Sequence, residues 1–289
     1  MKTAVITTGG LGTRLLTCTK SNPKAMMPLY SQSIDNNPEP MLRPLVETVF
    51  ENLYDHGFRR FCFIVGEKTK KSIINHLTPD PEFIELLKKR NTVVDKRFIK
   101  MLNRIYKKFN NSEIRWVSQS TPMGFGDALL SSKKFVGKEP FLLHAGDAYI
   151  PDYKFLSDFL KNSKSKQISS TILVQRRKII KGYGLANIKK KNNENIVFHV
   201  EEKPKKPQSN WVMLPIYYFQ PTIFEALSQT SKGYNGELQV TDAIETMIKA
   251  NKKVVAFNYG QKGWFDIGIP PNYFHALEIS YKEARKKKK

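Results

Sequence analysis

The stretch TAVITTGGLGTRLLTCTKSNPKAMMPL, from Thr3 to Leu29, decides how the rest of the chain is interpreted. Its β-branched, apolar start at Ala4–Thr8 predicts a buried strand, and the glycines of Gly9–Arg14 predict a loop of nearly bare backbone. Such a loop lets backbone N–H groups approach an anion closely, and Arg14 and Lys24 add positive charge where a polyphosphate would bind. The stretch therefore predicts a phosphate-binding loop behind a strand. Taken alone, it is equally compatible with a tight turn that carries two surface cations.

Two widespread phosphate loops do not fit this stretch. No Gly-Lys-Ser/Thr follows the glycines, which excludes a Walker A loop. A dinucleotide fingerprint needs a third glycine where Leu15 stands and an acidic residue at the end of a second strand, and the sequence has neither. A nicotinamide-dependent enzyme is therefore disfavoured.

The stretch resembles the signature of the sugar-nucleotide pyrophosphorylases, a family of nucleotidyltransferases: a G-x-G-T-R loop followed by P-K and a further proline. The matching residues follow in the same order and spacing at Gly10–Arg14, Pro23-Lys24 and Pro28. Thr19-Lys20, just before the Pro-Lys, is most similar to the bacterial-type UTP–glucose-1-phosphate uridylyltransferases. Two residues depart from the family pattern, since Thr17 replaces a proline and Ala25 an acidic residue, and this leaves the choice of nucleotide open.

This resemblance implies where the nucleotide binds. It assigns the triphosphate to Gly9, Gly10, Leu11, Gly12, Thr13, Arg14 and Lys24. It assigns the base to Gln119, at the end of a strand expected over 113–119, and to the glycines of the following turn, Gly124 and Gly126. A side-chain amide can pair with a pyrimidine edge, and glycines leave room for the ring. Without the resemblance, this segment would be an ordinary strand–loop–helix turn.

Two aspartates are the expected metal ligands. The apolar run Phe141–Ala145 predicts a strand that leads into Asp147, and ligands of open α/β sheets collect at the carboxyl ends of strands. A carboxylate beside a phosphate loop suits Mg²⁺, which prefers hard oxygen ligands. The resemblance makes Asp147 one Mg²⁺ ligand and Asp266, in the W-x-D-x-G pattern of Trp264–Gly268, the other. On residues alone, both could be turn aspartates.

The resemblance also implies a sugar-phosphate site. It assigns the sugar to Gly184 of a Gly-Tyr-Gly turn, the sugar hydroxyls to Glu202, and the sugar phosphate to Lys203. A carboxylate suits two vicinal hydroxyls, and an ammonium group suits a phosphate dianion. Taken alone, Glu-Glu-Lys-Pro at 201–204 is an ordinary charged strand end. The stretch 236–244 is expected to close one side of the sugar pocket.

Alternating patterns along the chain predict an α/β fold. We expect helices over 42–56 (with Gly57 as its C-cap), 69–77, 82–109 and 270–284, the third being a long solvent-facing helix. We expect further strands over 60–65, 169–175, 211–219 and 254–258, and a hairpin with its tip at 189–195. Pro215 suggests an irregularity or a sheet edge. Strand, helix and strand in succession generate a parallel sheet.

The expected fold is a three-layer α/β/α sandwich, a Rossmann-like nucleotide-diphospho-sugar transferase fold with a mixed, mostly parallel sheet. We expect one domain over 1–289, with a nucleotide-binding half at about 1–177. The sugar-binding half would run over about 178–289 and include the C-terminal helix.

Composition limits the class of protein but does not identify its chemistry. The chain has 289 residues, 40% of them hydrophobic, with no run of transmembrane length and no signal-peptide pattern, so we expect a cytoplasmic protein without a membrane partner. The formal charge of +22 makes nucleic-acid binding one function to consider. The lysines are spread along the chain without aromatic interleaving, which disfavours it. Cys18 and Cys62 are too far apart in sequence to suggest a disulfide framework.

The implied reaction converts UTP and glucose 1-phosphate into UDP-glucose and pyrophosphate with Mg²⁺ as cofactor. Arg14, Lys24, Asp147 and Lys203 would form the catalytic set. Two alternatives stay open: a related nucleotidyltransferase that uses dTTP or another sugar 1-phosphate, and a non-catalytic sugar-nucleotide or RNA-binding protein. The resemblance also makes a homo-oligomer one expected state of the protein, because members of the family commonly form homo-oligomers.

Overall fold

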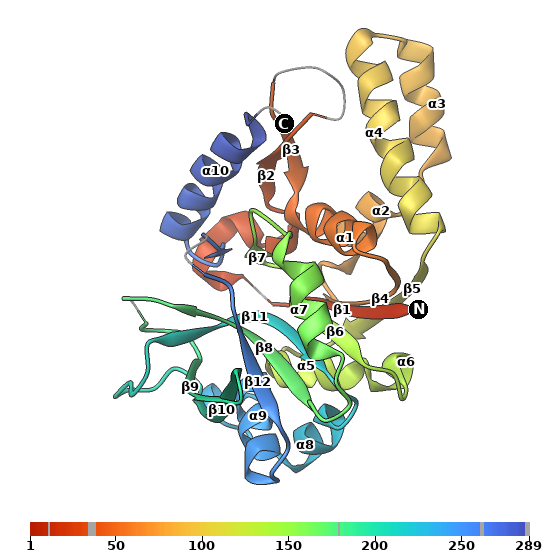
Figure 1. Cartoon of the computed structure of the whole chain (residues 1–289). Coiled ribbons are helices and arrows are strands. Elements are labelled where there is room, and N and C mark those ends of the chain that lie inside the picture. The colour runs from red at the N-terminus through yellow and green to blue at the C-terminus, as the bar shows by residue number, and fades with distance from the viewer. Residues whose placement is uncertain (11, 34–38, 179, 261–262, 287–289) are drawn as a thin grey trace.

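A computed structural model describes residues 1–10, 12–33, 39–178, 180–260 and 263–286 (Figure 1). Its centre is a nine-stranded sheet with the order β5-β4-β1-β6-β11-β8-β12-β10-β9. The strands are β1 (Lys2–Thr8), β4 (Phe58–Gly66), β5 (Glu113–Gln119), β6 (Phe141–Ala145), β8 (Ser170–Arg176), β9 (Leu185–Lys191), β10 (Glu194–Glu201), β11 (Trp211–Phe219) and β12 (Val254–Asn258). None of the helices in these described ranges has the length and hydrophobicity needed to span a bilayer.

The sheet is mixed, with most strands in one direction, as expected. β5, β4, β1 and β6 pair in parallel, and so do β8 and β12. β11 runs antiparallel to β6 and β8, and β10 runs antiparallel to β12 and β9. In the described part of the chain, therefore, β11 and β10 oppose the remaining strands of this sheet.

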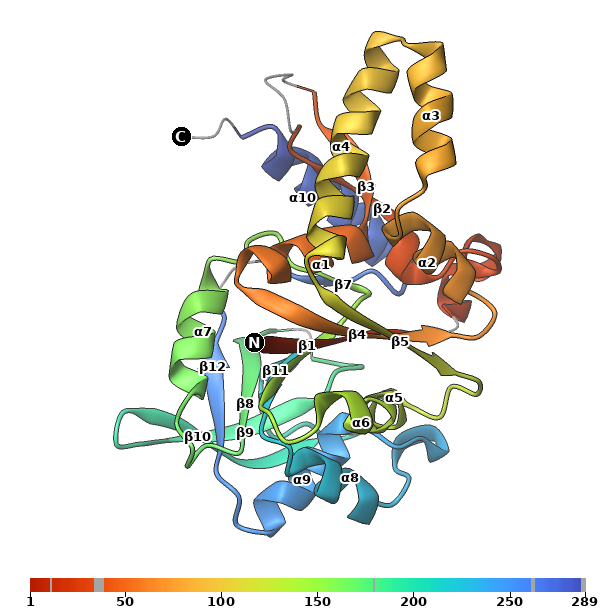
Figure 2. The ribbon, with the colours of Figure 1, turned by 90° about the vertical axis from the view of Figure 1, so that its right-hand side faces the viewer.

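Alternation along the central strands divides the core into two layers. Ile6 and Phe63 face a cluster that includes α1 (Leu45–Asp55), α4 (Val93–Asn110) and α7 (Phe155–Ser163). Their neighbours Val5 and Ile64 face the opposite cluster, which is covered by α5 (Phe125–Ser131), α8 (Ile223–Gln229) and α9 (Val240–Lys249). Successive side chains of a strand point to opposite faces, so each buried strand feeds both layers. Figure 2 shows the helices above and below the strands, and the three-layer prediction is confirmed.

Two helix predictions need correction. The helix expected from residue 42 begins at Leu45, because β3 (Met41–Pro44) pairs with β2 (Pro28–Ser31) and Pro44 keeps the preceding residue extended. The single long helix expected over 82–109 is an antiparallel pair, α3 (Pro81–Arg90) and α4, which projects from the sheet in Figure 1. Asn91 has a left-handed φ of 54°, and Thr92 caps α4 through a reciprocal capping box.

The stretch 185–219 differs from the expectation at two points. The hairpin strands β9 and β10 extend into the expected tip, so that only Asn192 and Asn193 form the turn, both at positive φ. Pro215 does mark an irregularity, since the β11–β8 register shifts between Met213 and Tyr217. The edge alternative is wrong, because β11 is interior and also pairs with β9.

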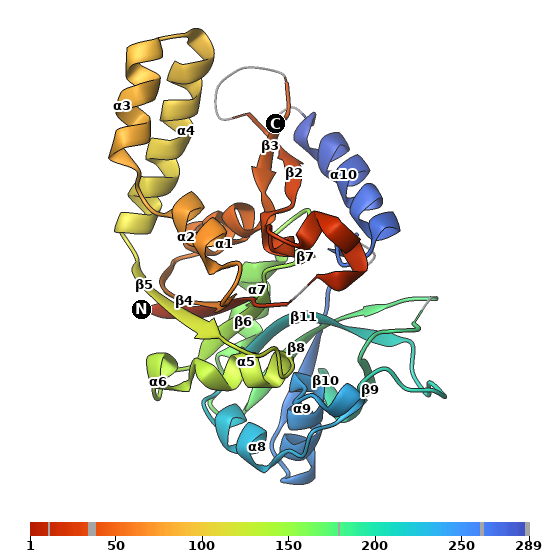
Figure 3. The same ribbon diagram turned by 180° about the vertical axis from the view of Figure 1, so that it is seen from behind.

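The C-terminal helix lies beside the β2–β3 pair, as the rear view in Figure 3 shows. The expected C-terminal helix is confirmed as α10 (Pro270–Ala284). It packs on β2 through the rings of Tyr30 and Tyr281, whose centroids are 5.0 Å apart. The expected helix over 69–77 is α2 (Lys70–Leu77). Smaller elements are α6 (Lys133–Val136), β7 (Ala148–Tyr149), β13 (Phe265–Asp266) and the 3₁₀ turns Thr13–Thr19, Lys24–Met26 and Tyr234–Gly236.

Candidate active site

A cavity of about 580 Å³ opens where the carboxyl ends of β1, β5 and β6 meet β9, β10 and β11. This volume is typical of small-molecule sites. The cavity is lined by every expected site residue that the structure describes, apart from Gly126: Gly9, Gly10, Gly12, Thr13, Arg14, Lys24, Gln119, Gly124, Asp147, Gly184, Glu202, Lys203 and Asp266. Leu11 lies outside the described residues.

The glycine loop is held tightly at Gly12. This residue has a φ of 69°, and a Cβ there would lie 2.9 Å from the Thr19 side chain and 3.1 Å from Cγ of Lys24. The Thr19 hydroxyl donates to the Gly12 carbonyl at 2.7 Å. By contrast, a Cβ at Gly10 would meet nothing within 4 Å. The loop therefore needs glycine at position 12 for its own folding and leaves the backbone of Gly10 open.

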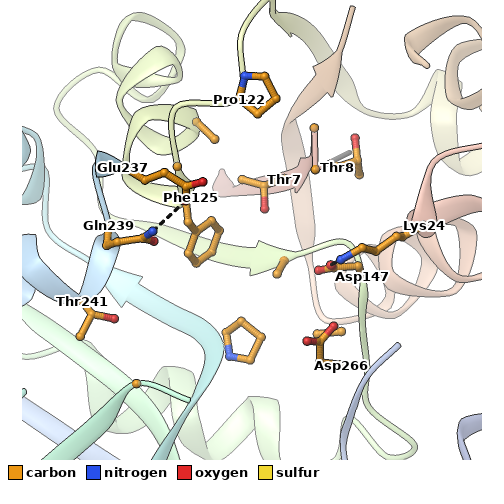
Figure 4. A pocket seen from close by; sticks show the side chains of 18 of the residues that line it. Thr7, Thr8, Lys24, Pro122, Phe125, Asp147, Glu237, Gln239, Thr241 and Asp266 are labelled. Carbon is orange, nitrogen blue, oxygen red and sulfur yellow. Dashed lines mark hydrogen bonds and ion pairs between the residues drawn. The ribbon is translucent and has the colours of Figure 1, made fainter. Parts of the chain in front are cut away.

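Lys24 and Asp147 meet on one side of the cavity, as Figure 4 shows. The Lys24 Nζ lies 3.1 Å from Oδ2 of Asp147, and the lysine side chain is only 12% exposed. Pro23 precedes the short 3₁₀ turn that carries Lys24, and Asp147 is the second residue after β6. The Gly146 N–H donates to the Thr7 carbonyl at 2.8 Å, which ties the Asp147 turn to the end of β1.

A two-stranded ladder brings the second aspartate beside the first. In the β13–β7 pair, Asp266 is opposite Ala148, the neighbour of Asp147. The Arg14 Nη2 lies 3.5 Å from Oδ2 of Asp266. The Gly268 N–H donates to Oδ1 of the same carboxylate at 2.8 Å. Two carboxylates and two cations from four separate segments therefore converge here.

The charge pattern of this end suits a divalent cation. Burial and the negative charge of Asp147 raise the pKa of Asp266, while Lys24 and Arg14 act in the opposite direction. Two adjacent carboxylates offer the hard oxygen donors that Mg²⁺ prefers, and this ion commonly completes its shell with waters and substrate phosphates. Within the described ranges no group of three or more His, Cys, Asp or Glu side chains could hold a metal by itself. The residues present thus fit an ion shared with a phosphate.

The opposite side of the cavity is polar and built around Glu202. The Thr241 hydroxyl donates to Oε2 of Glu202 at 2.7 Å. A Cβ at Gly184 would lie 3.0 Å from that oxygen and 3.1 Å from the Thr241 hydroxyl, so only glycine leaves this pair undisturbed. The Lys203 Nζ lies 3.2 Å from Oε1 of Glu202 and 4.7 Å from the centre of the Tyr234 ring. A carboxylate and an ammonium group thus stand side by side.

Gln119 and Gly124 line a third part of the cavity. A Cβ at Gly9 would lie 2.9 Å from Oε1 of Gln119, so the amide oxygen covers the glycine. Gly124 has a φ of 112°, which favours glycine. Gly126 differs from the expectation: it is buried in α5, and its N–H donates to the Leu238 carbonyl at 2.8 Å, so it supports the wall rather than lining it.

Several lining residues were not singled out from the sequence. Glu237, Gln239 and Thr241 come from the stretch expected to close the sugar side, and Figure 4 shows them across the cavity from Lys24. Gln239 donates from Nε2 to Glu237 at 2.9 Å. Phe125, which follows Gly124, and Tyr183, between two glycines, also line the cavity. For Phe125 and Tyr183, the signal was their place next to assigned glycines.

Comparison with known proteins agrees with this geometry. A UTP–glucose-1-phosphate uridylyltransferase of Bacillus subtilis (strain 168) is 29% identical over 93% of this chain and 87% of its own length. A protein of Methanocaldococcus jannaschii is 31% identical over 86% of this chain and 83% of its own. The structure of a UTP-bound UGPase from Acinetobacter baumannii has a TM-score of 0.78 and 26% identity, and the match covers 96% of this chain and 93% of that one.

The family assignment rests on nearly the whole chain. The family model described as nucleotidyl transferase matches residues 3–283. This range runs from β1 to the last turn of α10 and includes all four segments that supply Arg14, Lys24, Asp147 and Asp266. With its fold, its cavity and its relatives in agreement, this chain belongs to the nucleotidyl transferase family.

Proposed function

We propose that this nucleotidyl transferase is a UTP–glucose-1-phosphate uridylyltransferase, which forms UDP-glucose and pyrophosphate. One observation carries the proposal: a single cavity holds two cations and two carboxylates at one side and the Glu202–Lys203 pair at the other. Such a cavity can hold two anionic substrates at once. The Bacillus subtilis relative, which carries this activity in its name, supports the choice of substrates.

The reaction needs positioning more than proton transfer. An oxygen of the sugar phosphate attacks the α-phosphorus of UTP, forming one P–O bond while the bond to pyrophosphate breaks. This nucleophile is already ionised at neutral pH, so no general base is required. Catalysis then consists of aligning two anions and neutralising the charge that develops. None of the described residues that line the cavity is a histidine or a cysteine, in keeping with this chemistry.

Each charged residue has a proposed role. Arg14 and Lys24 bind the triphosphate and stabilise the charge on the leaving pyrophosphate. Lys203 holds the sugar phosphate, since an ammonium group is a compact partner for a phosphate dianion. Glu202, whose second oxygen is fixed by Thr241, accepts hydrogen bonds from sugar hydroxyls. Gly9, Gly10, Gly12 and Thr13 supply backbone N–H groups to the phosphates.

Asp147 and Asp266 would hold Mg²⁺. When bound, the ion would neutralise phosphate charge and orient the α-phosphate for attack. Lys24 lies against Asp147 and Arg14 against Asp266, so the two cations would hold the aspartates in place for this role. A metal dependence that tracks these two residues, and not Glu202, would support this part of the proposal.

An activity panel tests the proposal directly. Purified protein would be mixed with Mg²⁺, each of five nucleoside triphosphates, dTTP included, and several sugar 1-phosphates, and pyrophosphate release would be measured. We expect UTP with glucose 1-phosphate to give the highest kcat/KM. Lys24→Ala should abolish most of this activity, while Lys133→Ala, an exposed lysine on α6, should leave it unchanged. A clear preference for dTTP or another sugar phosphate would overturn the choice of substrates. Absence of pyrophosphate release for every pair, with tight RNA binding that weakens steeply with salt, would overturn the enzyme.

A further inference from the structure

Gln119 is held by a carboxylate that does not line the cavity. Its Nε2 donates to Oδ2 of Asp127 at 2.7 Å, and the two residues are eight positions apart. Gln119 ends β5, and Asp127 lies in the first turn of α5. The strand, the loop and the helix start therefore form a closed unit around the glutamine side chain.

This contact decides which way the amide faces. A carboxylate accepts hydrogen bonds and donates none, so the Gln119 amide must turn its NH₂ group toward Asp127. The carbonyl oxygen Oε1 then lies over Gly9, whose Cβ, if it had one, would be only 2.9 Å away. Both Gln119 and Gly9 line the cavity. The edge turned to a ligand thus has a fixed order of acceptor and donor.

A fixed order selects among nucleobases. Uracil and thymine present a carbonyl oxygen and an N3–H group on the edge that an amide can pair with. Cytosine presents an amino group and a bare N3 on the same edge, which is the reverse order. With the amide held as it is, Oε1 can accept a hydrogen bond from N3–H of uracil or thymine. With cytosine, the bare N3 would face Oε1, so that one acceptor would lie opposite another. A polar site that cannot pair rejects a ligand far more strongly than an apolar one.

We propose that Asp127 is a positioning residue that locks the Gln119 amide and thereby makes the enzyme select a base with an N3–H group. This inference deepens the proposed function and rests on it for the identity of the nucleotide site. It concerns the choice between UTP and CTP and does not separate UTP from dTTP, since uracil and thymine share this edge.

A helix effect offers a competing explanation for an aspartate at this position. Carboxylates in the first turn of a helix are stabilised by the helix dipole wherever they occur. Asp158 provides the matched control, because it lies in the first turn of α7, is exposed and does not line the cavity. Asp127→Asn and Asp158→Asn remove the same charge from the same kind of position, and only the first touches Gln119.

The test compares specificity rather than activity. For each variant, kcat/KM would be measured for UTP and CTP with glucose 1-phosphate, and the dissociation constants of both nucleotides would be measured by calorimetry. We expect the wild-type protein to prefer UTP over CTP by about 10²-fold or more. Asp127→Asn lets the amide turn over, because an asparagine side chain can accept or donate. The preference should therefore fall by about tenfold or more, chiefly through a gain with CTP.

Two further variants keep the test decisive. Asp127→Ala should relax the preference as Asp127→Asn does, which covers the case in which one variant fails to fold. In a Gln119→Ala background, Asp127→Asn should produce no additional change, since its effect passes through the glutamine. Asp158→Asn should leave the UTP-to-CTP ratio at the wild-type value.

The outcomes separate this inference from the proposed function. An unchanged ratio in both Asp127 variants, or an equal loss in the Gln119→Ala background, would overturn the positioning role while the enzyme stands. A wild-type protein that binds UTP and CTP equally would overturn it as well. Conversely, a protein that releases no pyrophosphate but binds UTP in preference to CTP, with a preference that depends on Asp127, would refute the enzyme and retain the inference.

Discussion

A methyl group on Gly268 would lie 2.7 Å from Oδ1 of Asp266, an oxygen that already accepts the Gly268 N–H at 2.8 Å. The same methyl group would be 2.8 Å from Arg14 Nη2 and 3.1 Å from Lys24 Nζ. The glycine therefore keeps open the space in which three charged side chains converge. Here the need for glycine comes from crowding by the site and not from a left-handed backbone.

Gly268→Ala should displace Asp266 and Arg14 without unfolding the protein. Misplacement of catalytic groups by about 1 Å can cost roughly 10²-fold in rate, and we expect a loss of kcat of this order. Thermal denaturation should give a melting temperature close to that of the wild type. A variant with wild-type kcat would contradict the crowding argument, and a variant that melts much earlier would assign the glycine to folding instead.

Lys24→Ala should impair the chemical step. Loss of one group that stabilises developing charge typically costs about 10²-fold or more in kcat, and Lys24 is the less exposed of the two cations at this end. Steady-state kinetics with UTP and glucose 1-phosphate would give kcat and both KM values. Lys133→Ala serves as the surface control. Unchanged kcat and KM in Lys24→Ala would remove this lysine from the site.

The first strands of the sheet could be predicted because their signals are local. Ala4–Thr8 and Phe141–Ala145 are short apolar runs bounded by glycine, and they form adjacent buried strands. The break between α3 and α4 was missed although its signal is in the sequence. Thr92 and Asp95 are spaced as a capping box, but the apolar residues on both sides continue a helical rhythm that hides it. The regular spacing of apolar residues led to the prediction of one helix, although the capping-box residues mark the start of a second.

The site could be predicted only where a motif preserved it. Lys24 and Asp147 meet across 123 residues of sequence, and no spacing rule brings them together. The prediction rested on the family resemblance and on the rule that ligands collect at the carboxyl ends of strands. The contact between Gln119 and Asp127 is local, yet it was also missed. It depends on the side-chain orientation at a strand end and a helix start, which propensity and periodicity do not specify.

Thr241→Val should weaken binding of the sugar phosphate. The Thr241 hydroxyl donates to Glu202 at 2.7 Å, and its removal frees a carboxylate whose orientation the site requires. Loss of one such hydrogen bond to a charged group is worth about 1.5–3 kcal/mol, so the KM for glucose 1-phosphate should rise about tenfold or more. The KM for UTP should change little.

Thr246→Val provides the control for that experiment. Thr246 lies on the same helix, and its hydroxyl is 2.9 Å from that of Thr230. It does not line the cavity. This variant should keep both KM values. Equal effects of the two substitutions would mean that the helix α9, rather than the Glu202 contact, sets the affinity for the sugar.

Arg43→Met should lower the free energy of unfolding, because Arg43 joins β3 to α1 through Glu47 and Glu51. Arg43 is 8% exposed and donates from Nε to Glu47 at 2.7 Å, with a further hydrogen bond to Glu51. Removing one partner of a buried ionic cluster typically costs about 3–5 kcal/mol of unfolding free energy. Glu113→Gln breaks the exposed pair with Arg60 and should cost about 1 kcal/mol or less. Urea denaturation of both variants would compare them, and equal costs would contradict the importance of burial.

His144 should make stability fall in mild acid. It is fully buried in β6, its Nδ1 lies 2.7 Å from the Ala145 carbonyl, and its Nε2 lies 2.8 Å from the Tyr153 hydroxyl. Burial lowers the pKa of His144 to about 4. Between the ordinary histidine pKa of about 6.5 and this value, the unfolded chain binds a proton that the folded protein refuses, so the unfolding free energy decreases as pH falls.

The histidine contribution can be isolated by substitution. The full shift corresponds to about 3 kcal/mol, lost progressively from about pH 6.5 to pH 4 and level below that range. His144→Gln keeps a donor and an acceptor but does not titrate there. The difference in unfolding free energy between wild type and variant, measured by urea denaturation at several pH values, should therefore shift in favour of the variant as the pH decreases. A difference that stays constant from pH 7 to pH 4 would mean that His144 is charged in the folded protein, or that its burial does not affect its titration.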